Sequence, residues 1–369
     1  MKEHDYRDPA LRIEGDLRKK LQSSSSRSSF LPFLKKKLLK YKRKSRDWVR
    51  YVDRSFSWIN GQYALGLFST ESPRAIRTLT RYYDRLLLVN RLGMPVFEVP
   101  DQTIHGEVLL SLYEQYGKKR FLPLIREAAA RLKRIAAEND GLVIYWPPDR
   151  TILVDTLGMI PRFCYHYAEL FNDPEMVAIA DRLLDFTEER CMDPECGLPF
   201  HAYDLETGRP GGSSTWGRGI GWYLLGLTAR AERDEAWRDR LFQVFELVFR
   251  TQDAEGFLWD DLAQQKHVDS SPTCMAALCL ARCLDRELYA PEQSAELPGW
   301  LRGCISALLS SVNEAGEVLN CSGECEGAGV YAQKFGNYFS QGYTLMLFKM
   351  LEQSERLRRY LNASDEVTQ

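Results

Sequence analysis

The stretch Met275-Ala276-Ala277-Leu278-Cys279-Leu280 carries apolar side chains on every face that a helix would present. A helix that is apolar all round is a buried helix. Five other segments have the same character and are rich in Leu, Ala, Gly, Met and Cys. The six helices are expected to start near Ser57, Asp101, Asp155, Thr215, Asp269 and Asn337, at intervals of 44 to 68 residues.

Segments with one apolar stripe and one charged face alternate with these six helices, as at 122–138 and 173–190. Such helices lie at the surface with the stripe toward the core. A hairpin of one buried and one outer helix cannot bury its own apolar face, so neighbouring hairpins must stack, and closing the ring removes the exposed ends. The sequence therefore predicts an all-α fold, an (α/α)6 barrel or six-hairpin toroid, with strands confined to the connections.

The expected barrel spans residues 30–361, with a mobile segment at 1–29 before it and a tail at 362–369 after it. Serine is concentrated just before residue 30, which is typical of a linker. In the segment 33–52, lysines and arginines then alternate with leucines. This segment is either the sixth outer helix, which we favour because that hairpin lacks another partner, or a basic amphipathic helix on an anionic membrane.

The composition excludes several classes of protein. The chain has 369 residues, of which 44% are hydrophobic, and this is enough for a large core. A net charge of −2 argues against nucleic acid as a partner. No apolar run is long enough to span a membrane, and the first residues are too charged for a signal peptide, so a cytoplasmic protein is expected.

Cysteine usage points to reduced thiols. Nine cysteines are an odd number for a disulfide framework, and three of them, among them Cys279, fall inside an apolar helix. The pairs Cys191/Cys196 and Cys321/Cys325 lack the two-residue spacing of zinc knuckles, and the chain has few histidines to complete a site. The sequence therefore predicts no structural metal ion at these pairs.

The segment Ser214-Thr215-Trp216-Gly217-Arg218-Gly219-Ile220-Gly221-Trp222 combines two indoles and a guanidinium with three glycines. Glycine lets the backbone come close to a ligand or to a neighbouring helix. A tryptophan face can stack on a sugar ring, and a guanidinium can grip a carboxylate with two hydrogen bonds. The segment is therefore either a site for an anionic ligand such as a uronic acid, or a helix start whose tryptophans fill the core and whose arginine neutralises a buried acid.

Three aspartates, Asp101, Asp155 and Asp269, stand where buried helices are expected to begin. Aspartate is a preferred N-cap, so each can be a purely structural residue. In a closed barrel, however, the buried helices run parallel and their N-termini meet at one cavity mouth. Asp155 has apolar neighbours and is the better candidate for a general acid, whereas Asp101 is expected to be more hydrated and to orient the substrate.

One histidine, His201, lies shortly before the Trp-Gly-Arg segment and follows Phe200. Its imidazole can hydrogen-bond a sugar hydroxyl or a carboxylate. A histidine among aromatic residues is more often structural, because histidine is commonly part-buried. Both roles remain open on the sequence.

The segment 216–222, Trp-Gly-Arg-Gly-Ile-Gly-Trp, resembles the Trp-x-Arg-Gly-Asn-x-Trp segment of unsaturated glucuronyl and unsaturated rhamnogalacturonyl hydrolases, glycoside hydrolase families 88 and 105. The segment 154–159 resembles the Asp-Thr/Asp-Leu-x-Met segment that carries their catalytic aspartate. Asp101 matches their other active-site aspartate. Ile220 departs from the pattern, because the family has a polar Asn there, and this departure bears on the choice of aglycone.

The resemblance extends over most of the chain, from about Trp58 to Leu347. It implies an (α/α)6 barrel and hydration of the C4–C5 double bond that a polysaccharide lyase leaves on a terminal uronic acid. By resemblance, Asp155 protonates C4 and activates water, and Asp101 helps to place substrate and water. The partner implied is an unsaturated uronate-containing oligosaccharide, with no metal or cofactor. The other matched residues would contact the sugar, and they are His201, Trp216, Arg218 and Trp222.

Two other functions stay open on the sequence. One is a related barrel-shaped glycosidase that acts on saturated uronides. The other is a non-catalytic protein that binds an anionic glycan, at a membrane surface through the basic segment 33–52. The presence of Asp155 together with Asp101 favours the enzyme.

Overall fold

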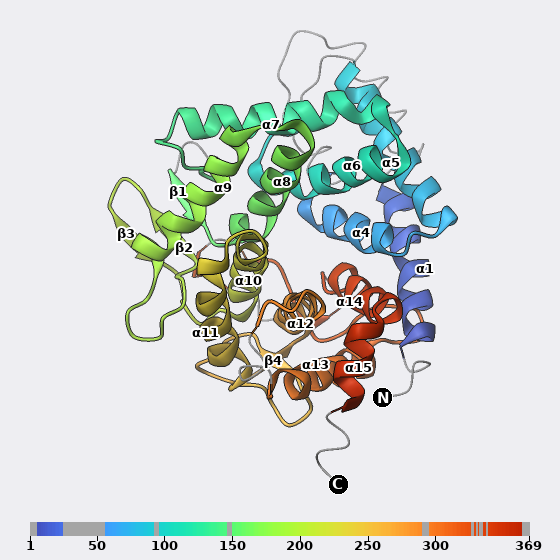
Figure 1. Cartoon of the computed structure of the whole chain (residues 1–369), viewed down its shortest axis with the longest axis vertical. Coiled ribbons are helices and arrows are strands. Elements are labelled where there is room, and N and C mark those ends of the chain that lie inside the picture. The colour runs from blue at the N-terminus through green and yellow to red at the C-terminus, as the bar shows by residue number, and fades with distance from the viewer. Residues whose placement is uncertain are drawn as a thin grey trace.

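The computed structural model describes residues 6–24, 56–91, 96–145, 150–289, 295–325 and 339–363, together with 328–329, 331 and 335–336. Long helices dominate these residues, and the strands are two or three residues long (Figure 1). The predicted all-α class is confirmed. No helix among the described residues is long and apolar enough to cross a lipid bilayer.

Six helices form the inner ring of the barrel. Each inner helix contacts the next inner helix, and the last inner helix contacts the first, so the ring is closed (Figure 1). They begin within four residues of the predicted starts, which confirms the (α/α)6 barrel. Their bounds are α4 (Trp58–Ser69), α6 (Thr103–Tyr116), α8 (Asp155–Phe171), α10 (Gly217–Ala231), α12 (Ser270–Asp285) and α14 (Gln341–Gln353).

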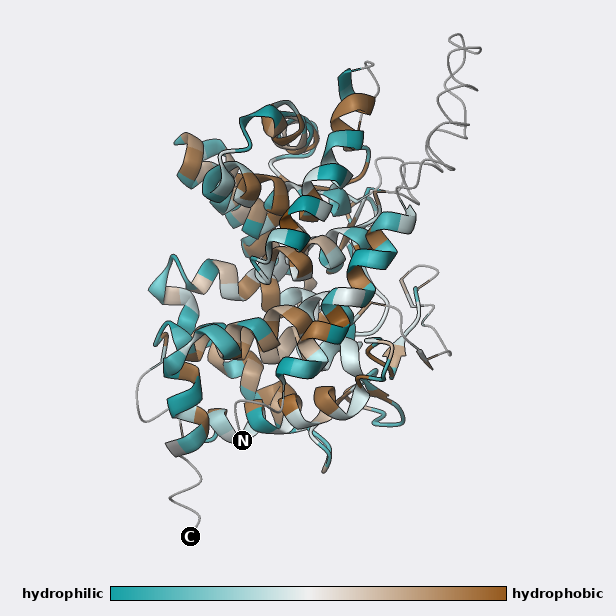
Figure 2. Cartoon of the chain, turned by 90° about the vertical axis from the view of Figure 1, so that its right-hand side faces the viewer, coloured by the Kyte–Doolittle hydropathy of each residue, from teal (hydrophilic) through white to brown (hydrophobic). Residues whose placement is uncertain are grey.

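The outer helices cover the ring with their apolar stripes turned inward, and hydrophilic and hydrophobic bands alternate along them (Figure 2). In α5, for example, Leu79, Tyr83 and Leu86 are buried, while most of the arginines face outward. The core that results is a single cluster running through the whole barrel. The outer helices are α5 (Pro73–Arg91), α7 (Leu122–Ala137), α9 (Pro174–Phe186), α11 (Arg238–Phe249), α13 (Leu297–Ser311) and α15 (Glu355–Ala363).

The N-terminal part of the chain differs from the prediction. Residues Arg7–Ser24 form helix α1, which packs against α4, α5 and α14 (Figure 1). Ile13, Leu17 and Leu21 recur at helical spacing on its inner face and are fully buried. The prediction of a mobile segment at 1–29 is therefore wrong for these residues, because α1 covers the seam between the last and first inner helices. The predicted helix 33–52 lies outside the described residues. The serine-rich linker begins within α1, which ends at Ser24, and its remainder also lies outside them.

Short strands occur in the connections that precede inner helices, as predicted. β1, β2 and β3 form an antiparallel sheet in which Leu153 pairs with Ala202. This register places the residues just beyond the pair, Val154 and His201, side by side, and the Val154 N–H donates to the His201 carbonyl at 2.9 Å. The strands are β1 (Thr151–Leu153), β2 (Ala202–Asp204), β3 (Arg209–Gly211), β4 (Leu258–Trp259), β5 (Val268–Asp269), β6 (Cys321–Ser322) and β7 (Phe335–Gly336).

Inner helices approach closely where one of them carries glycine. A Cβ at Gly226 on α10 would overlap the backbone carbonyl of Leu157 on α8, and a Cβ at Gly342 on α14 would overlap that of Gln62 on α4. Buried thiols fill other parts of these contacts, and Cys279 on α12 is fully buried, as predicted. The spacing of the ring therefore depends on small residues at its helix contacts.

Replacing Gly226 with alanine is expected to lower the free energy of unfolding by about 1–3 kcal/mol, because α8 and α10 must move apart to admit one methyl group. Urea denaturation of the purified variant measures this loss. Gly299→Ala is the matched control. Gly299 lies in helix α13, where an added Cβ would have no described atom within 4 Å, so its replacement should raise stability by about 0.4–1 kcal/mol. Equal effects of the two changes would contradict the close contact.

Candidate active site

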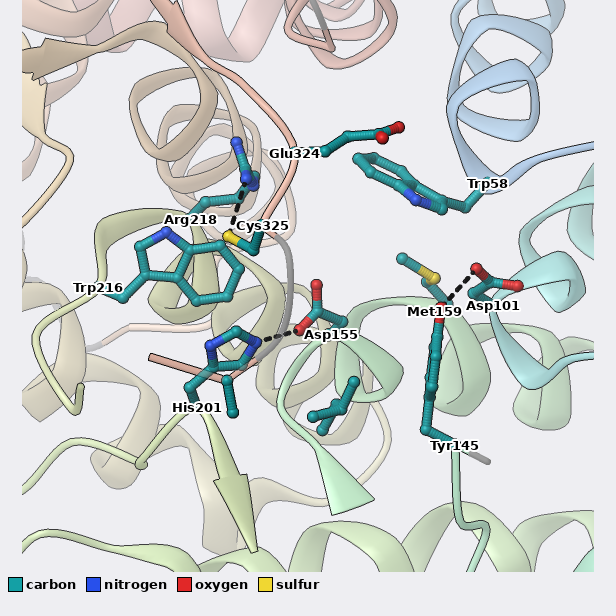
Figure 3. A pocket seen from close by; sticks show the side chains of 12 residues that line it. Trp58, Asp101, Tyr145, Asp155, Met159, His201, Trp216, Arg218, Glu324 and Cys325 are labelled. Atoms are coloured by element: carbon teal, nitrogen blue, oxygen red, sulfur yellow. Dashed lines mark hydrogen bonds and ion pairs between the residues drawn. The ribbon is translucent and has the colours of Figure 1, made fainter. Parts of the chain in front are cut away.

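A cavity of about 370 Å³ opens at the end of the barrel where the inner helices begin (Figure 3). Residues from helices, connections and the loop after β6 meet around it. The starts of α4, α8 and α10 and the turn before α6 share this mouth, and it brings most of the predicted site residues together. The lining consists of Trp58, Asp101, Tyr145, Leu153, Asp155, Met159, His201, Trp216, Arg218, Glu324, Cys325 and Ala328.

Asp155 is the first residue of α8, and its side chain is 21% exposed to the cavity. The Oδ2 atom lies 3.3 Å from Nε2 of His201. In Figure 3 the second carboxylate oxygen points away from this contact toward the middle of the cavity. One oxygen of Asp155 is thus held by the protein, and the other is available to a ligand.

A chain of contacts orients His201, which is itself 3% exposed. The backbone N–H of Ser213 donates to the hydroxyl oxygen of Tyr331 at 2.7 Å, and that hydroxyl lies 3.3 Å from Nδ1 of His201. Because a backbone N–H can only donate, the Tyr331 hydroxyl can use its own proton to donate to Nδ1. When the imidazole is neutral, its remaining proton is on Nε2, the nitrogen that lies 3.3 Å from Oδ2 of Asp155. Ser213 and Tyr331 therefore fix the ring of His201 beside the carboxylate of Asp155.

Tyr331→Phe is expected to lower kcat about tenfold, roughly 1.4 kcal/mol of transition-state stabilisation, with little change in KM. The phenyl ring keeps the packing but removes the hydroxyl that fixes the proton position on His201. Steady-state kinetics on the best substrate measure this change. Tyr113→Phe on α6, outside the cavity lining, is the control. An unchanged kcat in the Tyr331 variant would show that the contact chain does not orient His201.

Asp101 lies on the opposite side of the cavity from His201 (Figure 3), in the short helix η1 (Pro100–Gln102). The hydroxyl of Tyr145 donates to its Oδ2 at 3.1 Å. The side chain of Gln102 accepts from two backbone N–H groups of the preceding turn and fixes the position of η1. Asp101 is 6% exposed and more buried than Asp155. The expected difference in hydration is thus reversed, because the ring of Tyr145 stands beside Asp101.

The two tryptophans of the 216–222 segment do not offer open faces to the cavity. The ring of Trp216 packs against His201 and Tyr331, with centroids 4.3 and 5.3 Å away, and Trp216 is 4% exposed. Trp222 is 1% exposed and packs nearly perpendicular to Trp58, with ring centroids 5.6 Å apart. The predicted packing of Trp222 against a sugar is therefore corrected, because Trp222 lies outside the lining and supports Trp58 from behind. Trp58 is the partly exposed indole of the cavity (Figure 3).

Arg218 is 3% exposed and holds a loop in place. Its Nη1 donates to the carbonyl and the hydroxyl of Ser322, at 2.9 and 2.6 Å, and its Nη2 donates to the carbonyl of Gly323 at 2.7 Å. These bonds use the donors that the sequence suggested for a forked grip on a ligand carboxylate. The positive charge still borders the cavity, and the loop that it anchors carries Glu324 and Cys325 into the lining.

The glycines of the segment serve contacts within the protein. A Cβ at Gly217 would overlap the carbonyl of Trp259, and a Cβ at Gly221 would lie 3.0 Å from the sulfur of Met275. Ile220, the position that departs from the family pattern, is 2% exposed and packs in the core. Of the two interpretations of this segment, the structure agrees with a helix start whose tryptophans fill the core. Trp216 and Arg218 nevertheless border the cavity.

Asp269 does not reach the cavity lining. It is fully buried, caps α12 through the Ser271 N–H at 2.8 Å, and accepts a hydrogen bond from the Ser322 hydroxyl. Of the three aspartates at helix starts, two therefore face the cavity and one is structural.

Sequence reasoning assigned no role in the site to several lining or supporting residues. Trp58 is the first residue of α4 and follows the predicted start at Ser57, so a place at a helix start is the signal that it shares with Asp101 and Asp155. Tyr145 and Tyr331 lie in irregular connections, which carry no periodic signal. The residues concerned are Trp58, Tyr145, Met159, Glu324, Cys325 and Tyr331.

Comparisons with known proteins agree with this geometry. A profile of Glycosyl Hydrolase Family 88 matches residues 37–354, most of the chain. The chain is similar in structure to a possible member of family GH105 from Klebsiella pneumoniae subsp. pneumoniae MGH 78578, with a TM-score of 0.73 and 16% identity over 96% of this chain and 94% of that one. No curated protein matches the sequence.

Two further structures share the fold. An unsaturated glucuronyl hydrolase from Bacillus sp. GL1, responsible for the degradation of glycosaminoglycan, has a TM-score of 0.65 and 16% identity over 84% of this chain and 87% of that one. An unsaturated glucuronyl hydrolase specific for heparin has a TM-score of 0.65 and 16% identity over 80% and 85% of the two chains. At these identities the likeness shows the fold alone.

Proposed function

The chain belongs to glycosyl hydrolase family 88, and we propose that it releases a terminal 4,5-unsaturated uronic acid from oligosaccharides left by a polysaccharide lyase, by hydrating the C4–C5 double bond. The observation that carries the proposal is the pair of carboxylates, Asp155 and Asp101, on two sides of one cavity of about 370 Å³. Two solved structures with this fold are named unsaturated glucuronyl hydrolases, which supports the same chemistry.

In the proposed reaction, Asp155 starts protonated and donates its proton to C4 of the vinyl ether. The C4–C5 π bond supplies the electron pair, and positive charge develops at C5 and the ring oxygen. Water adds at C5 and returns a proton to Asp155, so the enzyme ends as it began. The C5 hemiketal opens to a ketone, and the hemiacetal left at C1 collapses to an aldehyde and the free aglycone alcohol.

The remaining residues of the cavity fit this scheme. His201 holds Oδ2 of Asp155, which leaves the other oxygen to transfer the proton (Figure 3). Asp101 is positioned to orient the sugar and the water. The indole of Trp58, supported by Trp222, offers an apolar surface to the sugar ring. The buried charge of Arg218 favours an anionic uronate at this mouth.

The test is a panel of lyase products of different uronic acids and linkages, with their saturated counterparts. The expected result is loss of the ultraviolet absorbance of the double bond at the same initial rate as the aglycone is released. Release that runs ahead of the absorbance loss would indicate attack at the anomeric carbon. Cleavage of saturated uronides would favour the alternative glycosidase. Binding without turnover across the whole panel would favour a glycan-binding protein.

A further inference from the structure

A second cavity, of about 530 Å³, lies toward the opposite end of the barrel from the catalytic mouth. It is formed by α6, α8, α10 and α12, and its residues come mostly from the second halves and C-terminal ends of these helices (Figure 1). Charged side chains make up most of its lining, with four arginines against three glutamates and one histidine. The lining consists of Glu107, Arg162, Tyr165, His166, Glu169, Ala229, Glu232, Arg233, Arg282 and Arg286.

Two of the three glutamates of this cavity, Glu107 and Glu232, are already neutralised by basic groups of the protein. Glu232 receives two hydrogen bonds from Arg282, at 2.8 and 2.7 Å, and Arg286 lies 3.4 Å from its Oε2. On the other wall, Glu107 accepts a hydrogen bond from Nε of Arg162 at 3.1 Å and lies 3.2 Å from Nδ1 of His166. Each of these two acids therefore faces two basic groups, of which His166 also contacts Glu114 at 3.2 Å. With Glu169 included, the four arginines of the lining outnumber its glutamates by one, which leaves a small excess of positive charge.

Guanidinium donors remain unused within the part of the chain that the structure describes. Arg162 bonds Glu107 through Nε, and its two terminal nitrogens have no hydrogen-bond partner there, although the side chain is 28% exposed. The guanidinium of Arg233 stacks 5.0 Å from the ring of Tyr165 and makes no ion pair with described residues. Two arginines, Arg162 on α8 and Arg233 in the turn after α10, thus present guanidinium N–H groups without described partners to the same space.

The pKa shifts of Arg162 and Glu107 agree with an excess of positive charge in this cavity. Burial lowers the pKa of Arg162, and the nearby charge of Arg282 lowers it further. Burial alone would raise the pKa of Glu107, yet Arg162, His166 and Arg282 together hold it below its usual value. Arg162 and Arg282 therefore repel each other inside this cavity, Glu107 and Glu232 offset part of that repulsion, and an anion bound beside Arg162 would relieve more of it.

We propose that this second cavity is a binding site for a small oxyanion, held by Arg162 and Arg233 with Arg282 and Arg286 close by. Guanidinium groups present paired N–H donors that match the oxygens of phosphate and of carboxylate alike. The bound anion ties α8 to α10 and α12. The site is separate from the catalytic mouth and does not depend on the proposed reaction.

The proposal is tested by thermal unfolding and titration calorimetry with inorganic phosphate and with glucuronate, at constant ionic strength set with sodium chloride. One equivalent of anion should bind per chain, and a hundred-fold excess over Kd should raise the wild-type Tm saturably by roughly 3 °C. A response to phosphate alone assigns the site to phosphate-type dianions. A response to glucuronate alone assigns it to sugar acids.

Variants show where the anion binds. Arg233→Gln should weaken binding about tenfold without loss of the fold, since Arg233 is exposed and makes no ion pair with described residues. Arg250→Gln, a change of another exposed arginine just after α11, should leave it unchanged. An undiminished response in the Arg233 variant would place the anion elsewhere, and the absence of a saturable response to either anion would overturn the proposal directly.

Discussion

Asp155→Asn is expected to lower kcat by at least about 1,000-fold while the variant still binds unsaturated oligosaccharides. The amide has the size of the carboxylate, and it can still contact His201, but it cannot deliver a proton to C4 or take one from water. The measurement is the rate of loss of ultraviolet absorbance from the best product of the lyase panel. Titration calorimetry with the same product measures binding.

Two controls make this result specific. Asp239→Asn removes an exposed carboxylate on α11, remote from the cavity, and should leave kcat unchanged. Asp101→Asn should raise KM as well as lower kcat, because Asp101 is proposed to orient the substrate rather than to transfer the proton. A residual rate within tenfold of wild type in the Asp155 variant would mean that another group is the acid.

The barrel was predictable because its signal is local and repeated. Each inner helix is apolar on nearly all faces, as at 275–280, and this pattern needs no knowledge of distant contacts. The failure at α1 has a physical cause. Ile13, Leu17 and Leu21 form an apolar stripe on a highly charged segment, and the stripe becomes meaningful only once the seam between α14 and α4 exists to be covered.

The candidate site was predictable in part for the same reason. Asp101 and Asp155 stand at helix starts, and a closed barrel must bring helix starts together. The contacts of the segment 216–222 could not be predicted in this way. Its Trp and Arg side chains contact residues more than a hundred positions away, such as Ser322 and Tyr331. No spacing within the segment 216–222 indicates that Arg218 is committed to two backbone carbonyls rather than to a ligand.

Asp269 links the barrel to the candidate site. Among the substitutions considered, its replacement is expected to lower the stability of the protein the most. Its carboxylate caps α12 and accepts hydrogen bonds from the backbone N–H and the hydroxyl of Ser322. The same hydroxyl accepts from Arg218 at 2.6 Å. Because all three side chains are almost completely buried, no water can take over the role of the carboxylate.

Asp269→Ala should therefore lower the free energy of unfolding by about 3–5 kcal/mol, since it removes an N-cap and leaves the buried charge of Arg218 without the nearby negative charge. Urea denaturation measures the loss. Asp269→Asn keeps an oxygen for the cap and should cost less than half as much. Asp234→Ala removes the cap of an exposed turn and should cost about 0.5–1 kcal/mol.

The Asp269 substitution should also change the lining of the catalytic cavity. Ser322 precedes Gly323, Glu324 and Cys325 in the loop that Arg218 anchors, so a loosened Ser322 displaces part of the cavity lining. We expect the Asn variant, which stays folded, to show a raised KM, with kcat affected less, because Asp155 and His201 lie on other elements. If the Ala variant cost no more than the exposed Asp234 control, the buried network would not be holding the loop. If the Asn variant lost kcat alone, the loop would act on the chemical step rather than on binding.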